Sequence, residues 1–163
     1  MAKKSAKQDD QAPRTPRIGN RRAHFDYHII EKVEAGMELT GTEVKSLRSS
    51  SASLDGAYAM LRGDQVFLCG ANIAVYPQAV GQLQHDPLRD RRLLLHKRQI
   101  EQLKVHVAQK GHTLIPLAIY FKDGWAKCEI AAATGKRDFD KRESIQKREH
   151  DRDMQRVKGR KQY

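Results

Sequence analysis

The sequence predicts a mainly β fold with some helix, an antiparallel barrel with packed helices and disordered basic tails. Segments in which apolar and polar residues alternate outnumber segments with helical spacing. Short turns join them, and the Asp123-Gly124 pair is a strong hairpin signal. Both ends of the chain lack regular apolar spacing, so they cannot bury enough surface to fold alone. A barrel of the oligonucleotide-binding type is a natural candidate for such a domain.

The first half of the domain is expected to begin with a strand. Residues 24–34 interleave β-branched and aromatic residues with polar ones, which is typical of a strand. Thr42 is expected to cap a short helix over residues 43–48, whose basic residues share one side. Residues 57–69 contain two apolar runs around a Gly-Asp turn, which predicts a hairpin. We expect residues 72–76 to continue its second strand.

The second half is expected to contain a loop, a helix and a second hairpin. Residues 77–87 form the loop, and an apolar stripe at helical spacing then predicts a helix over about residues 93–110. Residues 113–121 and 125–131 give the clearest hairpin of the chain. Pro116 has no N–H group, so its strand should lie at an edge or carry a bulge there.

Positive charge is concentrated at the two ends of the chain. The net charge is +11 in total, with +5 in residues 1–24 and +5 in residues 134–163, so residues 25–133 are close to neutral. Basic tails can be merely solvated, but two of them beside one domain favour a nucleic-acid partner, since neutralising phosphates releases counterions. We therefore expect a disordered basic arm over residues 1–19, an RNA-binding domain over residues 20–133 and a basic tail over the remainder.

Few features favour an enzyme or a metalloprotein. The chain has no phosphate-binding glycine loop, no His-Glu-x-x-His and no Gly-x-Ser-x-Gly. His24 and His28 would share one face of the first strand, where stacking or hydrogen bonding is a better expectation than metal binding. Cys69 and Cys128 lack clustered partners, which indicates reduced, buried thiols. We expect no catalytic residue, no metal and no cofactor.

The length and apolar content of the chain limit its domain number and its possible location. The 163 residues suit one domain with tails. No apolar stretch is long enough to cross a bilayer, and no apolar run follows the first lysines as a secretory signal requires. We expect a cytoplasmic, monomeric protein without a membrane partner.

Several motifs in order, over about residues 18–163, resemble the SsrA-binding protein family. They are NRRAHFDY at 20–27, GMELTGTEVKSLR at 36–48, GANI at 70–73, DPLR at 86–89 with LLL at 93–95, and GKR at 135–137 with DKR at 140–142. Together these motifs are far more specific than any one of them alone.

This resemblance implies a barrel of the oligonucleotide-binding type and a role in trans-translation, the rescue of stalled ribosomes. Such a protein binds the tRNA-like domain of transfer-messenger RNA, stands in for the anticodon arm that this RNA lacks, and delivers it so that the nascent peptide is tagged. Its C-terminal tail would occupy the empty mRNA path of the small subunit, near the decoding centre and its ribosomal RNA. The elongation factor carrying aminoacylated tRNA would be an indirect partner.

The resemblance also implies a set of RNA-binding residues. Asn20 can donate and accept at a base edge, Glu34 can accept from amino or imino groups, and Leu94 can pack against a ribose or base. Each has a structural alternative, namely a turn-capping Asn, a strand salt bridge and a core Leu. Three cations are the candidates for phosphate contacts, unless they are ordinary surface charge: Arg22, Lys45 and Arg48.

The tail residues that match the family's ribosome-facing motif are Gly135, Lys136, Asp140, Lys141 and Arg142. Phe139 departs from the family's motif, because some members carry His or Tyr at this position. Phe keeps a planar ring that could stack on a decoding-centre base, but it has no ring nitrogen. Charge pairs at helical spacing recur in the tail, each worth roughly a few tenths of a kcal/mol. We expect a tail that is mostly disordered when free and helical against the ribosome; the alternative is a solvated helix docked on the body of the protein.

Two other classes stay open on the sequence alone. A structural ribosomal protein with basic extensions would copurify stoichiometrically with subunits. A small nuclease with an unrecognised carboxylate pair would cleave labelled RNA in the presence of a divalent metal.

Overall fold

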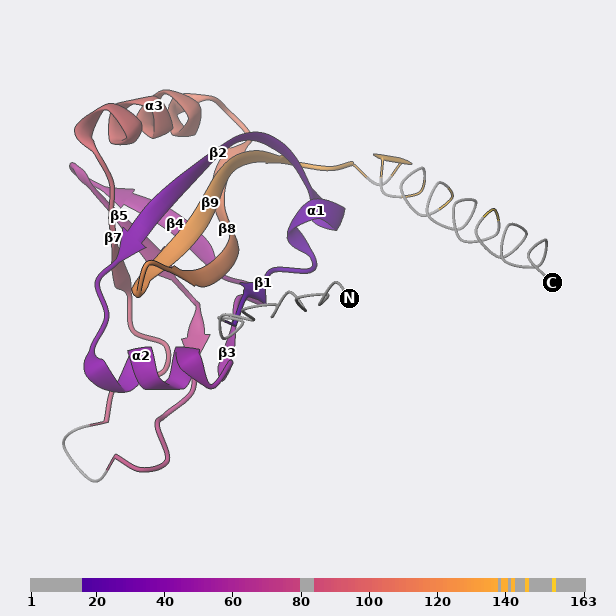
Figure 1. Cartoon of the computed structure of the whole chain (residues 1–163). Helices are drawn as coiled ribbons and strands as arrows, with labels where there is room; N and C mark the ends of the chain where they lie inside the picture. Colours follow the sequence, from indigo (N-terminus) through magenta and orange to yellow (C-terminus); the bar gives the residue numbers. More distant parts are fainter. Residues whose placement is uncertain are drawn as a thin grey trace, which may run out of the picture.

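The computed structural model describes residues 16–79 and 84–137, together with residues 139, 140, 142, 146 and 154. The elements in chain order are β1 (Ile18–Gly19), α1 (Ala23–Asp26), β2 (Tyr27–Met37), α2 (Gly41–Arg48), β3 (Ala52–Ser53), β4 (Tyr58–Arg62), β5 (Gln65–Cys69), β6 (Asn72–Ile73), β7 (Arg91–Leu94), α3 (Lys97–Ala108), β8 (His112–Lys122) and β9 (Trp125–Gly135). The fold is mainly antiparallel β with a few helices, as predicted. Figure 1 shows α3 at one end of the sheet and α2 at the opposite end.

The main sheet returns on itself. Its strand order is β1-β8-β4-β5-β7-β2-β9, and β9 pairs with β8 as well as with β2. Hydrogen-bonded neighbours can therefore be followed from β8 through β4, β5, β7, β2 and β9 back to β8. The short strands β3 and β6 form a separate pair. Of the predicted N-terminal arm, residues 1–15 lie outside the described residues, while Ile18 and Gly19 form β1 against β8.

Both predicted hairpins are present, because each has the turn chemistry that its geometry needs. Asp123 and Gly124 have φ values of 52° and 81°, the left-handed pair that a type I′ turn requires between β8 and β9. Gly63 has a φ of 61° in the turn between β4 and β5. The register of β8 shifts just after Pro116, so of the two predicted possibilities, a sheet edge or a bulge, the bulge is confirmed.

The first long strand begins later than predicted. Residues 23–26 form the one-turn helix α1, and β2 starts at Tyr27. Asn20 explains the difference, because its side-chain oxygen accepts hydrogen bonds from two backbone N–H groups that follow it and so starts a turn. His24 therefore lies in α1 and His28 in β2, and the prediction that they share a strand face is wrong.

Two further element predictions are wrong for local reasons. Residues 72–76 do not continue β5, because Gly70 with a φ of 69° turns the chain away and β6 pairs with β3 instead. The helix predicted from about Leu93 is preceded by the strand β7, in which Arg91 and Leu93 are buried while their neighbours are exposed. This two-residue period indicates a strand, and α3 begins only at Lys97.

The cap of α2 lies two residues before the predicted Thr42. Thr40 is the N-cap, and Glu43 is the third helical residue, whose carboxylate accepts a hydrogen bond from the Thr40 N–H at 2.8 Å. This reciprocal arrangement is a capping box, which satisfies backbone donors at the helix start.

Glu43 also anchors α2 to the segment that leads into β7. Its carboxylate accepts from Arg89 at 2.6 Å and from Arg91 at 2.8 Å, and the side chains of Glu43 and Arg91 are fully buried. Arg91 further donates to the backbone carbonyls of Ala71 and Pro87. Burial alone would raise the pKa of Glu43, but Arg89, the Thr40 amide and Arg91 outweigh it and lower the pKa to about 2.

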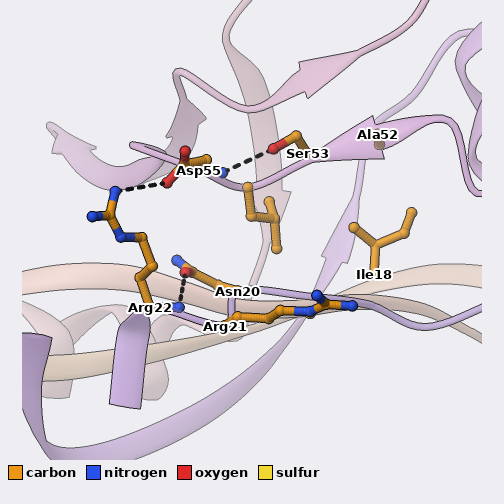
Figure 2. A pocket seen from close by; sticks show the side chains of 9 residues that line it. Ile18, Asn20, Arg21, Arg22, Ala52, Ser53 and Asp55 are labelled. Carbon is orange, nitrogen blue, oxygen red and sulfur yellow. Dashed lines mark hydrogen bonds and ion pairs between the residues drawn. The ribbon is translucent and has the colours of Figure 1, made fainter. Parts of the chain in front are cut away.

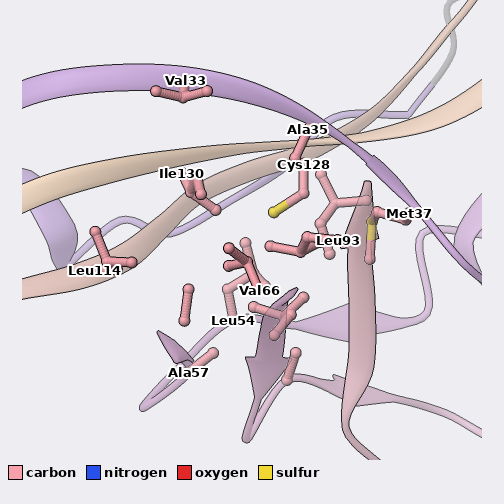
Figure 3. Packing of buried hydrophobic residues seen from close by; sticks show 14 of the residues in the cluster. Val33, Ala35, Met37, Leu54, Ala57, Val66, Leu93, Leu114, Cys128 and Ile130 are labelled. Atoms are coloured by element: carbon pink, nitrogen blue, oxygen red, sulfur yellow. The ribbon is translucent and has the colours of Figure 1, made fainter. Parts of the chain in front are cut away.

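The hydrophobic core fills the space enclosed by the strands (Figure 3). Val66 and Leu68 on β5 are fully buried and face residues from β2, β7 and β9. A smaller cluster around Ala23 and Ile115 packs α1 onto β8 and β9. This core fixes the strands whose outer faces carry the candidate site.

Candidate nucleic-acid interface

Glu34 and Leu94 meet at a surface cavity of about 410 Å³. Glu34 lies on β2 and Leu94 ends β7, which pairs with β2 through Gly36 and Leu94. Gly36 leaves room for this approach, because a Cβ there would lie 3.3 Å from the Leu94 Cβ. Leu94 is 49 % exposed, so it is not a core leucine and offers an apolar surface at the cavity. The other lining residues are Gly36, Leu95, His96, Gln99 and Lys127.

The Glu34 carboxylate is kept ionised by its neighbours. The Tyr120 hydroxyl donates a hydrogen bond to one carboxylate oxygen, and Lys122 Nζ lies 3.5 Å from the other. The Tyr120 hydrogen bond, with Lys122 and Lys127 behind it, lowers the pKa of Glu34, while the same bond raises the pKa of Tyr120 to about 12. Glu34 therefore makes the strand salt bridge that was its structural alternative. An ionised carboxylate has about four acceptor positions, so it can still accept from a base edge.

Asn20 is held by hydrogen bonds within the protein. Its Nδ2 donates to the Pro116 carbonyl at 3.1 Å, and its Oδ1 accepts from the N–H groups of Arg22 and Ala23, each at 3.2 Å. Figure 2 shows Asn20 beside Arg22 at the start of α1. This is the turn-capping role named as the alternative, and a contact from Asn20 to RNA stays a prediction.

Arg22 lies between two surface cavities of about 320 and 300 Å³, both of which it lines together with Asn20 and Asp55. Its guanidinium is 3.8 Å from the Asp55 carboxylate, and both side chains are largely exposed. Figure 2 draws this ion pair as a dashed line. An exposed pair at this distance contributes little to stability. Arg22 is therefore able to exchange Asp55 for a phosphate.

Lys45 and Arg48 are exposed on α2, and each stands over an aromatic ring. Lys45 Nζ is 5.2 Å from the centre of the Tyr76 ring, and Arg48 Cζ is 5.7 Å from that of Phe121. Contacts of this kind orient a cation without neutralising it. Both side chains remain able to contact phosphates.

The six predicted RNA-binding residues lie in three places rather than one. Glu34 and Leu94 share the cavity beside β7, Asn20 and Arg22 lie near α1, and the two cations of α2 line neither that cavity nor those beside Arg22. The prediction missed Tyr120 and Lys122, which hold the Glu34 carboxylate. The turn at residues 123–124 sets the hairpin register and predicts that these two side chains share a face, but it does not predict that this face meets Glu34.

The start of the C-terminal tail contacts the body. Gly135 ends β9, the Lys136 N–H donates to the Asp26 carbonyl at 2.8 Å, and Lys136 Nζ donates to the His24 carbonyl at 2.9 Å. Asp140 accepts from the Arg137 N–H at 3.1 Å. Of the other predicted ribosome-binding residues, Phe139 and Arg142 are exposed, and Lys141 lies outside the described residues.

Other kinds of site find little support in the described part of the chain. Its residues hold no group of three or more His, Cys, Asp or Glu side chains suited to a metal ion. Cys69 and Cys128 are free and buried, and burial raises their pKa values to about 11 and about 12, so both thiols stay protonated. Among the residues that can be placed, no helix is long and apolar enough to cross a membrane.

Comparisons with known proteins point to one family. The model of the SmpB protein family matches residues 17–160. The SsrA-binding protein of Trichodesmium erythraeum is 49% identical over 85% of this chain and 88% of that protein, and that of Levilactobacillus brevis is 46% identical over 96% and 98%. A chain from a solved tmRNA-SmpB structure, from work on the bacterial ribosome, is 43% identical, with a TM-score of 0.65 over 80% of this chain and 94% of that one.

Proposed function

Because the chain belongs to the SmpB family of SsrA-binding proteins, we propose that it binds the tRNA-like domain of transfer-messenger RNA and delivers it to stalled ribosomes for trans-translation. The observation that carries this function is the family match over residues 17–160, at 46–49% identity to the relatives described above. Its partners are this RNA and the ribosome. It acts in the cytoplasm, where ribosomes translate, and it contributes binding rather than a catalytic step.

The folded body is the part that holds transfer-messenger RNA. The half-exposed Leu94 supplies an apolar contact beside the ionised Glu34, which accepts from amino or imino groups of a base. Arg22, Lys45 and Arg48 neutralise phosphates around it, and Asn20 holds the α1 turn that presents Arg22. The closure of the strand ring through β8 and β9 supports the assignment of a barrel of the oligonucleotide-binding type, a scaffold that suits single-stranded and looped RNA.

The tail is the part that engages the ribosome. It begins after β9, within the predicted segment 134–163, and its net charge of +5 suits a path lined by ribosomal RNA. In this division the tail occupies the empty mRNA path and becomes helical there. The contacting residues are Gly135, Lys136, Phe139, Asp140, Lys141 and Arg142.

Truncation after Gly135 tests whether the body binds the RNA and the tail engages the ribosome. We expect the truncated protein to bind the tRNA-like domain of transfer-messenger RNA nearly as well as the full chain but to support no peptide tagging on stalled ribosomes. The triple substitution Asp140→Ala, Lys141→Ala and Arg142→Ala should act like the truncation. The matched control is the triple substitution Asp153→Ala, Arg156→Ala and Lys158→Ala, which also removes one acidic and two basic side chains from the tail. Tagging by the truncated protein would show that the tail is not the ribosome-engaging part.

The RNA that copurifies with the protein separates this function from that of a structural ribosomal protein. One dominant species with a tRNA-like end is the expected result. Stoichiometric recovery with a ribosomal subunit, without such an RNA, would favour the structural ribosomal protein instead.

A further inference from the structure

The chain's single tryptophan is exposed at the tip of a hairpin. Trp125 opens β9 directly after the turn, and 74 % of it is exposed, more than any other large hydrophobic residue in the described ranges. Tryptophan is highly buried on average, because its ring carries a large apolar area. A lone exposed apolar residue needs no explanation, so the surroundings of Trp125 decide whether its exposure has a use.

The register of the hairpin places Trp125 on the same face as the Glu34 site. Lys122 is directly opposite Trp125, and Tyr120 is directly opposite Lys127. Directly opposed residues share a face of an antiparallel sheet, as do residues two apart on one strand. The contacts from Tyr120 and Lys122 to Glu34 show that this face is the outer one.

This face is also continuous with the cavity beside β7. Lys127 is two residues from Trp125 on β9 and lines the cavity together with Glu34 and Leu94. An RNA strand that places one nucleotide in the cavity would have its neighbouring nucleotides over β9 and the hairpin tip. Trp125 therefore lies within reach of the RNA that the cavity holds.

The hairpin tip is built to hold the ring in place. The two-residue turn has the backbone geometry of a type I′ turn, and the strands on either side are 11 residues long. On the opposite face of the tip, Phe121 packs against the core, and Arg48 of α2 stands over its ring. A tryptophan has only two side-chain torsions, so a rigid tip presents it at a low entropic cost.

The chemistry around Trp125 suits a nucleobase. Its cross-strand neighbour Lys122 and the following Lys127 are cationic, whereas a protein partner with an apolar pocket would favour apolar neighbours around the ring. Aromatic rings between cations are the arrangement by which proteins stack unpaired bases while neutralising the adjacent phosphates. We propose that Trp125 stacks on an unpaired base of transfer-messenger RNA, next to the nucleotides held at Glu34 and Leu94; this rests on the proposed function.

The fluorescence of Trp125 can be used to measure the contact, because the chain has no other tryptophan. We expect the tRNA-like domain of transfer-messenger RNA to quench Trp125 fluorescence and to protect the ring from acrylamide, with saturation at the same RNA concentration as binding measured independently. Full binding with unchanged emission and unchanged acrylamide quenching would overturn the proposal.

Substitutions distinguish the contribution of stacking to RNA affinity from the contribution of charge. Trp125→Ala should lower the affinity about tenfold, as expected for the loss of one stacked base, whereas Trp125→Phe should keep most of it. Val105→Ala is the matched control, since Val105 is also an exposed apolar residue but lies on α3, at 63 % exposure. Trp125→Ala should leave the slope of log affinity against log salt unchanged, and Lys122→Ala should reduce it by about one phosphate contact.

The outcomes distinguish this proposal from the proposed function. If the unsubstituted protein does not bind the RNA, the proposed function is wrong. If it binds but Trp125→Ala binds equally well with an unchanged thermal unfolding midpoint, the stacking contact is wrong and the function stands. If Trp125→Ala keeps its RNA affinity but loses binding to ribosomes, the base belongs to ribosomal RNA and our assignment to transfer-messenger RNA is wrong.

Discussion

Two glutamates of this protein have similar partners but different surroundings. Glu43 lies at the start of α2, fully buried between Arg89 and Arg91, whereas Glu34 lies on the outer face of β2 beside Tyr120 and Lys122. Hydrogen bonds and cations lower the pKa of both carboxyl groups. The difference is that water or a ligand can reach Glu34 and cannot reach Glu43.

This difference determines what each carboxylate can do. A buried pair cannot exchange its partner, so removing one member leaves the other charged and unsolvated. An exposed pair is weak and screened, so its partners can be replaced by those of a ligand at little cost. The burial of Glu43 therefore assigns it to stability, and the exposure of Glu34 supports its proposed role in RNA recognition.

The largest expected effect is on stability. Glu43→Ala leaves Arg91 buried without its carboxylate and removes the capping box of α2, so we expect the free energy of unfolding to fall by about 3–5 kcal/mol. Urea unfolding measures it. Glu34→Gln is the control and should leave the unfolding midpoint unchanged. Equal midpoints for Glu43→Ala and the unsubstituted protein would contradict the structural assignment.

The contribution of Glu43 to stability should also depend on pH. Glu43 has a pKa of about 2 in the folded protein against an ordinary value of 4.5, so the folded state binds this proton less readily than the unfolded state. Its stabilisation is complete above about pH 5 and is lost as the pH falls toward 2, a change of about 3 kcal/mol. The stability of Glu43→Gln, measured by urea unfolding from pH 5 to pH 2, should fall less steeply. Parallel curves for the two proteins would show that Glu43 does not contribute.

Leu94 should affect binding more than stability. Leu94→Ala removes apolar surface that is already half exposed, so the unfolding midpoint should change little. If the leucine packs against a ribose or base, its loss should weaken binding to the tRNA-like domain of transfer-messenger RNA about tenfold, as measured by filter binding. Leu93→Ala on the same strand should lower the unfolding midpoint and leave the RNA affinity little changed, because Leu93 is buried. Unchanged affinity for Leu94→Ala would remove this residue from the interface.

The sequence was sufficient for features that depend on neighbouring residues. The Asp123-Gly124 turn, the Gly63 turn and the bulge after Pro116 were predicted because the required backbone geometry follows from those residue types. The strand β7 was missed because its two-residue period is short and leads directly into a helical stripe.

The parts of the site that escaped prediction depend on distant residues. Glu43 and Arg91 are 48 residues apart, and Glu34 and Tyr120 are 86 apart, so no local spacing indicates either contact. The exposure of Leu94 could not be predicted either, because LLL at 93–95 is uniformly apolar and only the pairing with Gly36 shows which leucine faces outward.

The central claim is that the exposed glutamate, and not the buried one, contacts RNA. It is tested most directly by the affinity of Glu34→Gln and Glu43→Gln for the tRNA-like domain of transfer-messenger RNA, at a temperature where circular dichroism shows both to be folded. We predict that Glu34→Gln binds about tenfold more weakly, because a neutral amide replaces an acceptor-only group, and that Glu43→Gln binds like the unsubstituted protein. Unchanged affinity for Glu34→Gln together with weakened binding by Glu43→Gln would contradict the account.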